Sequence, residues 1–169
     1  DGYTRPAREE LVTGGAMLAA DQYVKMLTQI KPNAQCDVLF PADPDATLPS
    51  GVELAAYDGI AWTGCSLTIY DGSKEVAKQI DFARAAFRAG VPSFGSCWAA
   101  QIAVVAAGGA CHANPKGREM GIARKIVLTS EGRDHLMYQG KPSVFDAFIS
   151  HVDEITCLPS GAAVLAGNS

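Results

Sequence analysis

Residues 95–101, Gly-Ser-Cys-Trp-Ala-Ala-Gln, place a cysteine between two different predicted secondary structures. The short apolar run 91–94 precedes them, and an Ala/Val-rich helical run extends over 101–107. A strand, a tight turn, a nucleophile and a helix in this order are typical of a nucleophile elbow, whose turn is too cramped for bulky neighbours. A helix N-terminus also favours the thiolate of Cys97 over the thiol. Although most free cysteines are small buried hydrophobes, this context predicts a catalytic role for Cys97.

Composition limits the classes of partner. The chain has 169 residues, 48% of them hydrophobic, and a net charge of −4 without a basic cluster, so we expect one compact domain that binds neither nucleic acid nor membrane. The uncharged stretch 91–115 contains Pro92, Gln101 and His112, which predicts a helix buried against a sheet instead of a membrane span. The five cysteines form no CxxC, so we expect no metal, no cofactor and no disulfide framework, and a cytoplasmic location.

Alternating predicted elements indicate an α/β fold. Helical spacing and turn residues predict helices over 16–30 and 73–90 and after the elbow, with strands over 36–40, 57–62 and 91–94. Such alternation implies βαβ units. Beyond Lys116 only short strand-like runs follow, at 122–129, 144–150 and 162–166. We therefore predict a flavodoxin-like, mainly parallel sheet with helices on both faces and an antiparallel C-terminal extension. Because such a sheet opens with a central strand, we expect one to precede Asp1.

Four ordered segments resemble a class I glutamine amidotransferase, most of all its GMP-synthase-like members. They are Tyr-Asp-Gly…Thr-Gly-Cys-Ser…Tyr-Asp over 57–71, Val-Pro-x-Phe-Gly-x-Cys-Trp-x-x-Gln over 91–101, Gly-Gly-Ala…Pro-x-Gly-Arg-Glu-x-Gly over 108–121, and Ser-His-Val-Asp…Leu-Pro-x-Gly-Ala-x-Val-Leu-Ala over 150–166. Such enzymes hydrolyse glutamine to glutamate and ammonia. The resemblance covers most of the chain and implies a single domain over residues 1–169.

The resemblance also implies residue roles. Cys97 would form a glutamyl thioester, and the backbone N–H groups of Cys65 and Trp98 would stabilise the oxyanion, a task for fixed donors. Arg118 and Glu119 match family positions with an expected structural role. Glycines of the family are replaced at Cys65, Ala99 and Val152. The residues implied in binding the substrate glutamine are Gly64, Gln101, Ser150, His151, Val152 and Asp153.

The general base is not evident from the sequence. A cysteine hydrolase needs a histidine and a group that orients it, and the chain contains His112, His135 and His151. His151 with Asp153 is an H-x-D pair, but it matches the substrate-contacting segment of the family, whose His-x-Glu motif would follow Ser169. Three interpretations stay open: a base beyond Ser169, His151 as the base of a rewired site, and a non-catalytic relative.

Three functions compete at this stage. The first is hydrolysis of L-glutamine through a Cys97 thioester, with ammonia passed to a synthetase partner or another acceptor. The second is a DJ-1/PfpI-like cysteine hydrolase or redox protein, which normally has an acidic residue near the strand end, whereas none stands between Val91 and Cys97. The third is a glutamine-binding or regulatory module without chemistry.

Overall fold

The computed structural model describes residues 1–168 and combines helices with short strands. In chain order the elements are α1 (Arg5–Thr13), α2 (Ala19–Ile30), η1 (Leu54–Ala56), β1 (Ile60–Trp62), α3 (Lys74–Arg88), β2 (Ser93–Gly95), α4 (Trp98–Ala106), β3 (Ala110–Ala113), β4 (Glu119–Leu128), α5 (Ser130–Asp134), η2 (Leu136–Tyr138), β5 (Val144–His151), β6 (Asp153–Cys157) and β7 (Ala166–Gly167). This content confirms an α/β fold.

The described strands form three small sheets. β1 and β2 pair in parallel, β3 and β6 pair antiparallel, and β4 lies between β5 and β7 in an antiparallel sheet. The antiparallel C-terminal region was predicted correctly. A mainly parallel sheet is not seen in residues 1–168, because the predicted strand over 36–40 has no strand assignment and leaves β1 and β2 as the only described parallel pair.

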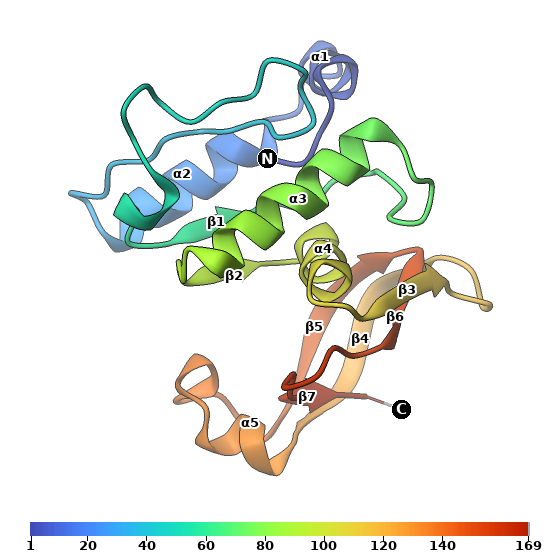
Figure 1. Cartoon of the computed structure of the whole chain (residues 1–169). Helices are drawn as coiled ribbons and strands as arrows, with labels where there is room; N and C mark the ends of the chain where they lie inside the picture. Colours follow the sequence, from blue (N-terminus) through green and yellow to red (C-terminus); the bar gives the residue numbers. More distant parts are fainter. Residues whose placement is uncertain (169) are drawn as a thin grey trace.

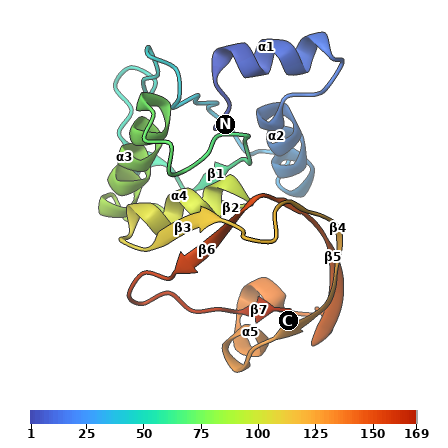
Figure 2. The ribbon, with the colours of Figure 1, turned by 90° about the vertical axis from the view of Figure 1, so that its right-hand side faces the viewer.

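Helices lie on both faces of the β1–β2 pair (Figures 1 and 2). α3 and α4 cover one face and α2 lies on the other, while β3 and β6 run beneath α4. β4 and β5 form a long curved hairpin that leads away from this layer to α5 and β7. The end of β5 returns to the region below β2, and it thereby brings residues near 150 toward the elbow.

α4 lies at the centre of the hydrophobic core. Its Trp98 and Ile102 are 2% and 1% exposed and pack with Val76 and Ala83 of α3. The indole N–H of Trp98 donates to Gln79 Oε1 at 2.9 Å, and the Gln79 amide donates to the Gly2 carbonyl at 3.1 Å. A buried polar group is stable only with such partners. The start of α4, which carries the elbow, is therefore fixed by apolar packing and a buried hydrogen-bond chain.

The N-terminal region is held by a buried ion pair. Arg8 donates to the Asp43 carboxylate at 2.6 Å and lies over the Phe40 ring at 3.8 Å, while Arg5 reaches the same carboxylate at 3.3 Å. Both partners of the Arg8 pair are about nine-tenths buried. Hydrogen bonds from Arg8 hold the pKa of Asp43 below its ordinary value. These contacts fix the loop at 41–45 against α1 instead of pairing 36–40 into a sheet.

No helix within residues 1–168 is long and apolar enough to cross a membrane.

Candidate functional site

The backbone at Cys97 has an unusual conformation. Its φ of 56° and ψ of −112° place a residue other than glycine in a sparsely populated region, directly between β2 and α4. Such strain persists only where the surrounding structure enforces it, and it concentrates at functional sites. The Cys97 side chain is exposed. The strand–turn–helix predicted from the sequence is therefore present, with a solvent-accessible thiol at the start of a helix.

The turn is as crowded as the sequence implied. A Cβ added to Gly95 would collide with the Ala99 side chain and lie 2.9 Å from Trp62 Cβ. Gly95 is consequently required for close approach of β1, β2 and α4. Ala99 is a helical residue of α4, so its methyl group needs no unusual backbone there.

Two segments distant in sequence approach the thiol. Cys97 Sγ lies 3.8 Å from the Ser150 carbonyl oxygen, which accepts a weak hydrogen bond from it. On another side, a Cβ on Gly64 would lie 3.6 Å from Cys97 Cβ and 4.0 Å from Sγ. The elbow, the loop after β1 and the end of β5 thus meet at Cys97, and the roles predicted for Gly64 and Ser150 in substrate binding stay predictions.

The two residues assigned to the oxyanion hole flank this point. Trp98 is the first residue of α4, so its N–H has no acceptor within the helix. Cys65 follows Gly64; its Sγ accepts from Leu67 N at 3.5 Å, and burial raises the pKa of its thiol to about 12. Neither Cys65 nor Val152 has a positive φ, so the replaced glycines create no strain at these positions.

Gln101 lies one turn beyond Cys97 on α4 and is 8% exposed. Its Oε1 is buried and has no hydrogen-bond partner among the described residues. An unpaired buried acceptor costs roughly 1–3 kcal/mol. Gln101 does not line the cavity beside Cys97, so its role in substrate binding stays a prediction.

The 150–153 segment is divided between the site and the scaffold. Ser150 and His151 line a cavity with Cys97. The Val152 carbonyl instead accepts from Asn114 N at 2.9 Å, and the Asp153 carboxylate accepts from the Tyr70 hydroxyl at 2.9 Å. That hydrogen bond with Asp153 raises the pKa of Tyr70. Tyr70 thereby ties the loop after β1 to β6.

His151 is held by Glu119. The two residues are directly opposite each other in the β4–β5 pair, and His151 Nε2 lies 3.2 Å from Glu119 Oε2. The Nδ1 atom is buried without a partner among residues 1–168. His112 pairs with Thr156 at 2.8 Å, and His135 Nδ1 accepts from Met137 N at 3.1 Å. Of the three histidines, His151 alone borders the Cys97 cavity.

The cavity beside Cys97 has a volume of about 600 Å³. β4 and β5 contribute Met120, Gly121, Phe148 and Ile149, and the elbow contributes Ser96. The Ser96 hydroxyl lies 2.8 Å from the hydroxyl of Tyr23 on α2. The sequence did not identify Tyr23, Ser96, Met120 or Phe148 as residues near the site. No local sequence pattern pairs a residue of α2 with the elbow, or brings side chains of β4 and β5 beside it.

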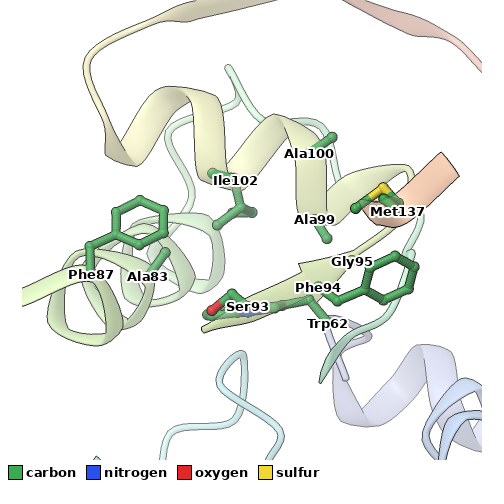
Figure 3. A pocket seen from close by; sticks show the side chains of 11 residues that line it. Trp62, Ala83, Phe87, Ser93, Phe94, Gly95, Ala99, Ala100, Ile102 and Met137 are labelled. Atoms are coloured by element: carbon green, nitrogen blue, oxygen red, sulfur yellow. The ribbon is translucent and has the colours of Figure 1, made fainter. Parts of the chain in front are cut away.

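A second cavity lies behind the elbow (Figure 3). It has a volume of about 270 Å³ between α3, α4 and β2, and Met137 closes one end. Ala83 and Phe87 of α3 and Ile102 of α4 border it. None of its lining side chains is titratable, and the Ser93 hydroxyl among them donates to the Val91 carbonyl at 3.4 Å, so the lining offers no arrangement that points to chemistry. Within residues 1–168 no cluster of His, Cys, Asp and Glu is arranged to hold a metal ion.

Comparisons with known proteins agree with this geometry. The family model for glutamine amidotransferase class-I matches residues 19–169. The chain is 39% identical over 173 residues to gamma-glutamyl-L-1-hydroxyisopropylamide hydrolase from Pseudomonas sp, an alignment that covers 99% of this chain and 57% of the relative. It is 35% identical over 123 residues to GMP synthase [glutamine-hydrolyzing] from Enterobacter sp. (strain 638), covering 70% of this chain and 21% of that protein. The chain thus spans 57% or less of the length of these curated relatives.

Solved structures show the same fold. A glutamine amidotransferase from Thermotoga maritima superposes with a TM-score of 0.68 at 19% identity, covering 85% of this chain and 59% of that one. A glutamine amido transferase from Methylobacillus flagellatus gives a TM-score of 0.58 at 22% identity, covering 72% and 46%. The family match favours the amidotransferase interpretation of the Cys97 elbow over the DJ-1/PfpI interpretation. The chain belongs to the class I glutamine amidotransferase family.

Proposed function

We propose that this protein hydrolyses γ-glutamyl amides through a thioester on Cys97. The observation that carries the proposal is the exposed Cys97 thiol, held at φ 56° at the N-terminus of α4 and facing the Ser150 carbonyl. L-Glutamine is the simplest such amide. The Pseudomonas relative, named as a γ-glutamyl amide hydrolase, supports amides with a substituent on nitrogen as a second group of substrates.

The reaction has two steps. Cys97 Sγ attacks the γ-carbonyl carbon, and the N–H groups of Cys65 and Trp98 stabilise the oxyanion. The C–N bond then breaks, the nitrogen leaves with a proton as ammonia or an amine, and the acyl group stays on sulfur. Water attacks the thioester, which releases glutamate and restores the thiol.

Recognition of the glutamyl part is assigned to groups on the other side of the nucleophile. Gly64 leaves room beside Sγ, Gln101 offers its unpaired Oε1 to a donor, and the main chain at Ser150 offers a carbonyl oxygen. Asp153, which the resemblance also assigns to substrate binding, has its carboxylate engaged by the Tyr70 hydroxyl and does not line the cavity beside Cys97. His151 and Val152 complete the segment by holding its backbone in place.

We assign His151 to substrate positioning, following the family resemblance, because the described hydrogen bond of Cys97 Sγ goes to the Ser150 carbonyl and not to the His151 ring. The alternative role for His151 is that of the general base. Replacement of His151 by alanine separates the two roles. Loss of a positioning group raises KM, whereas loss of a general base lowers kcat, so that saturating substrate does not restore the rate.

The broader setting is also a proposal. We infer that residues 1–169 form a single amidotransferase-type domain in which β1 and β2 belong to a flavodoxin-like sheet. Ammonia released from glutamine would pass to an acceptor or a synthetase partner, as the GMP synthase relatives suggest. A cytoplasmic location suits five free cysteines, one of which must stay reduced to act as a nucleophile.

The test is turnover by the intact protein with and without the thiol. Glutamate release is measured from L-glutamine and from γ-glutamyl isopropylamide, for the wild type and for Cys97→Ala. Cys157→Ala is the matched control, since Cys157 is equally exposed but lies on β6. Turnover that requires Cys97 and survives Cys157→Ala supports the proposal. Equal turnover in wild type and Cys97→Ala, or none with either amide, contradicts it.

A further inference from the structure

The loop at residues 63–73 joins β1 to α3 and belongs to no helix or strand. It passes directly beside the nucleophile, since a Cβ on Gly64 would lie 3.6 Å from Cys97 Cβ. Among residues 1–168, the backbone N–H of Cys65 donates no hydrogen bond to another protein group. This N–H is therefore free to donate to an oxyanion, and its position depends on what holds the loop.

The position of such a donor has to be accurate. An oxyanion donor acts from about 2.7–3.1 Å, and a misplacement of about 1 Å can lower a rate roughly a hundredfold. Two residues fix the path of the loop. Thr63 is 4% exposed and its hydroxyl accepts from Gly2 N at 3.2 Å, and Ile69 is 5% exposed in the core cluster that contains Trp98. Residues 64–68 are suspended between them.

The residue after Ile69 connects the loop to a different part of the molecule. The hydroxyl of Tyr70 donates to Asp153 Oδ1 at 2.9 Å, across 83 positions of the chain. Asp153 is the first residue of β6, where it pairs with Ala113 of β3. Cys111 of the same strand, β3, belongs to the core cluster beneath α4. The loop is thus tied to a strand that is itself fixed to the core.

The surroundings of Asp153 favour a role in this contact over a role as a substrate ligand. Tyr70 is the one group in residues 1–168 that donates a hydrogen bond to its carboxylate, and Asp153 does not line the cavity beside Cys97. The two roles require different chemistry. A partner for the Tyr70 hydroxyl needs only an acceptor oxygen, whereas a partner for the α-ammonium group of a substrate needs a negative charge.

Resting on the proposed hydrolysis through Cys97, we propose that Tyr70 and Asp153 are positioning residues for the oxyanion donor. Their hydrogen bond holds the loop at 63–73 against β6, so that the N–H of Cys65 stays directed at the oxyanion. Asp153 acts through Tyr70 and does not bind the substrate. Because the oxyanion develops only in the transition state, the Tyr70–Asp153 pair contributes to kcat and not to substrate affinity.

Steady-state kinetics of the intact protein with L-glutamine and γ-glutamyl isopropylamide tests this role. Tyr70→Phe keeps the ring and removes the hydroxyl, so kcat should fall about fivefold while KM changes by less than about twofold. Asp153→Ala should have the same effect. Asp153→Asn keeps an acceptor oxygen and should recover most of the kcat lost in Asp153→Ala. A large rise in KM in both Asp153 variants would overturn the proposal, because it would show that the carboxylate binds the substrate.

The double variant Tyr70→Phe/Asp153→Ala tests whether the two residues act as a pair. Its kcat should be no lower than that of either single variant, since both remove the same contact, and fully multiplicative losses would contradict the pairing. Tyr57→Phe is the matched control. It removes a tyrosine hydroxyl that donates to Asp37 at 2.8 Å, at the opposite end of β1, and it should leave kcat and KM unchanged.

Amide hydrogen exchange of residues 64–71 tests the contact without any substrate. Exchange in this loop should be faster in Tyr70→Phe than in the wild type and in Tyr57→Phe, while the protection of α3 stays the same. Unchanged exchange in the loop overturns the proposal whether or not the protein is active. An active wild type whose kcat is unaffected by Tyr70→Phe overturns the positioning role alone, and absence of wild-type turnover with both amides overturns the hydrolysis itself.

Discussion

The thiol of Cys97 lies 3.8 Å from the carbonyl oxygen of Ser150, a residue 53 positions later in the chain. This contact joins the elbow before α4 to the end of the β4–β5 hairpin. The proposed nucleophile of one layer and the backbone proposed to bind substrate in another therefore line a single cavity. This geometry leads to the following predictions for stability, catalysis and pH dependence.

Backbone strain at Cys97 should appear in stability. A residue other than glycine in this conformation costs of the order of 1–3 kcal/mol, and glycine does not incur it. We expect Cys97→Gly to have a free energy of unfolding about 1 kcal/mol higher than Cys97→Ala, measured by urea denaturation. Cys157 lies on β6 and has no positive φ, so there Cys157→Gly should have a lower free energy of unfolding than Cys157→Ala. A Cys97→Gly protein less stable than Cys97→Ala would show that the turn is not strained.

Two glycines near the nucleophile should respond differently to a methyl group. In Gly64→Ala the new Cβ contacts only Cys97, 3.6 Å from its Cβ and 4.0 Å from its Sγ, which are ordinary contact distances, so the fold should persist. We expect kcat/KM to fall about tenfold or more, because the methyl group crowds the thioester. Gly95→Ala should not fold stably, because its Cβ collides with Ala99 and Trp62. Circular dichroism tests whether each variant folds, and glutamate release tests whether it is active. A fully active Gly64→Ala variant would show that the substrate does not bind beside Gly64.

The Glu119–His151 pair should affect binding more than chemistry. Glu119→Ala removes the group 3.2 Å from His151 Nε2 and loosens the end of β5, so we expect KM to rise about fivefold to tenfold with a smaller change in kcat. Glu119→Gln keeps a polar partner and should restore most of the affinity. Steady-state kinetics on γ-glutamyl isopropylamide provides the readout. A drop in kcat without a change in KM would instead assign proton transfer to this pair.

The Arg8–Asp43 pair should make stability depend on acid pH. In the folded state the pKa of Asp43 is lowered from 3.8, chiefly by hydrogen bonds from Arg8. The ionised carboxylate therefore stabilises the fold at pH values above 3.8, and this contribution is lost as the pH falls through the lowered pKa of the folded state. At pH 7, Asp43→Asn should lower the free energy of unfolding by about 3 kcal/mol, since Arg8 stays buried. As pH falls below the lowered pKa of Asp43 in the folded state, the stabilities of the two proteins should converge. A difference independent of pH would contradict the ion pair as its cause.

Local chemistry made part of the fold predictable. The helix expected over 73–90 is α3, Lys74–Arg88, and Ser73 caps it by accepting from Val76 N at 3.3 Å. The elbow was found because its strand, glycine, cysteine and helix are contiguous. The strand over 36–40 was wrong: β propensity needs a neighbouring ladder, and these residues have none in the structure. α5 was missed because its four polar residues and one glycine have no apolar period. Its local signal is the cap, Thr129, whose side chain accepts from Gly132 N.

The candidate site also has a part that could be predicted from the sequence and a part that could not. Cys97 could be identified within one motif, and Gly64, Gln101 and Ser150 through the family resemblance. The Tyr23–Ser96 and Tyr70–Asp153 contacts join residues 73 and 83 positions apart. Only the folded chain creates them, so no local pattern could have predicted these two contacts.

The central claim is that Cys97 forms a γ-glutamyl thioester. The most direct measurement is mass spectrometry of the intact protein after incubation with an electrophilic diazoketone analogue of glutamine, followed by peptide mapping. The account predicts a single adduct on Cys97, blocked by excess glutamine or γ-glutamyl isopropylamide and absent in Cys97→Ala. No adduct, or an adduct on another of the five cysteines that persists in Cys97→Ala, would contradict it.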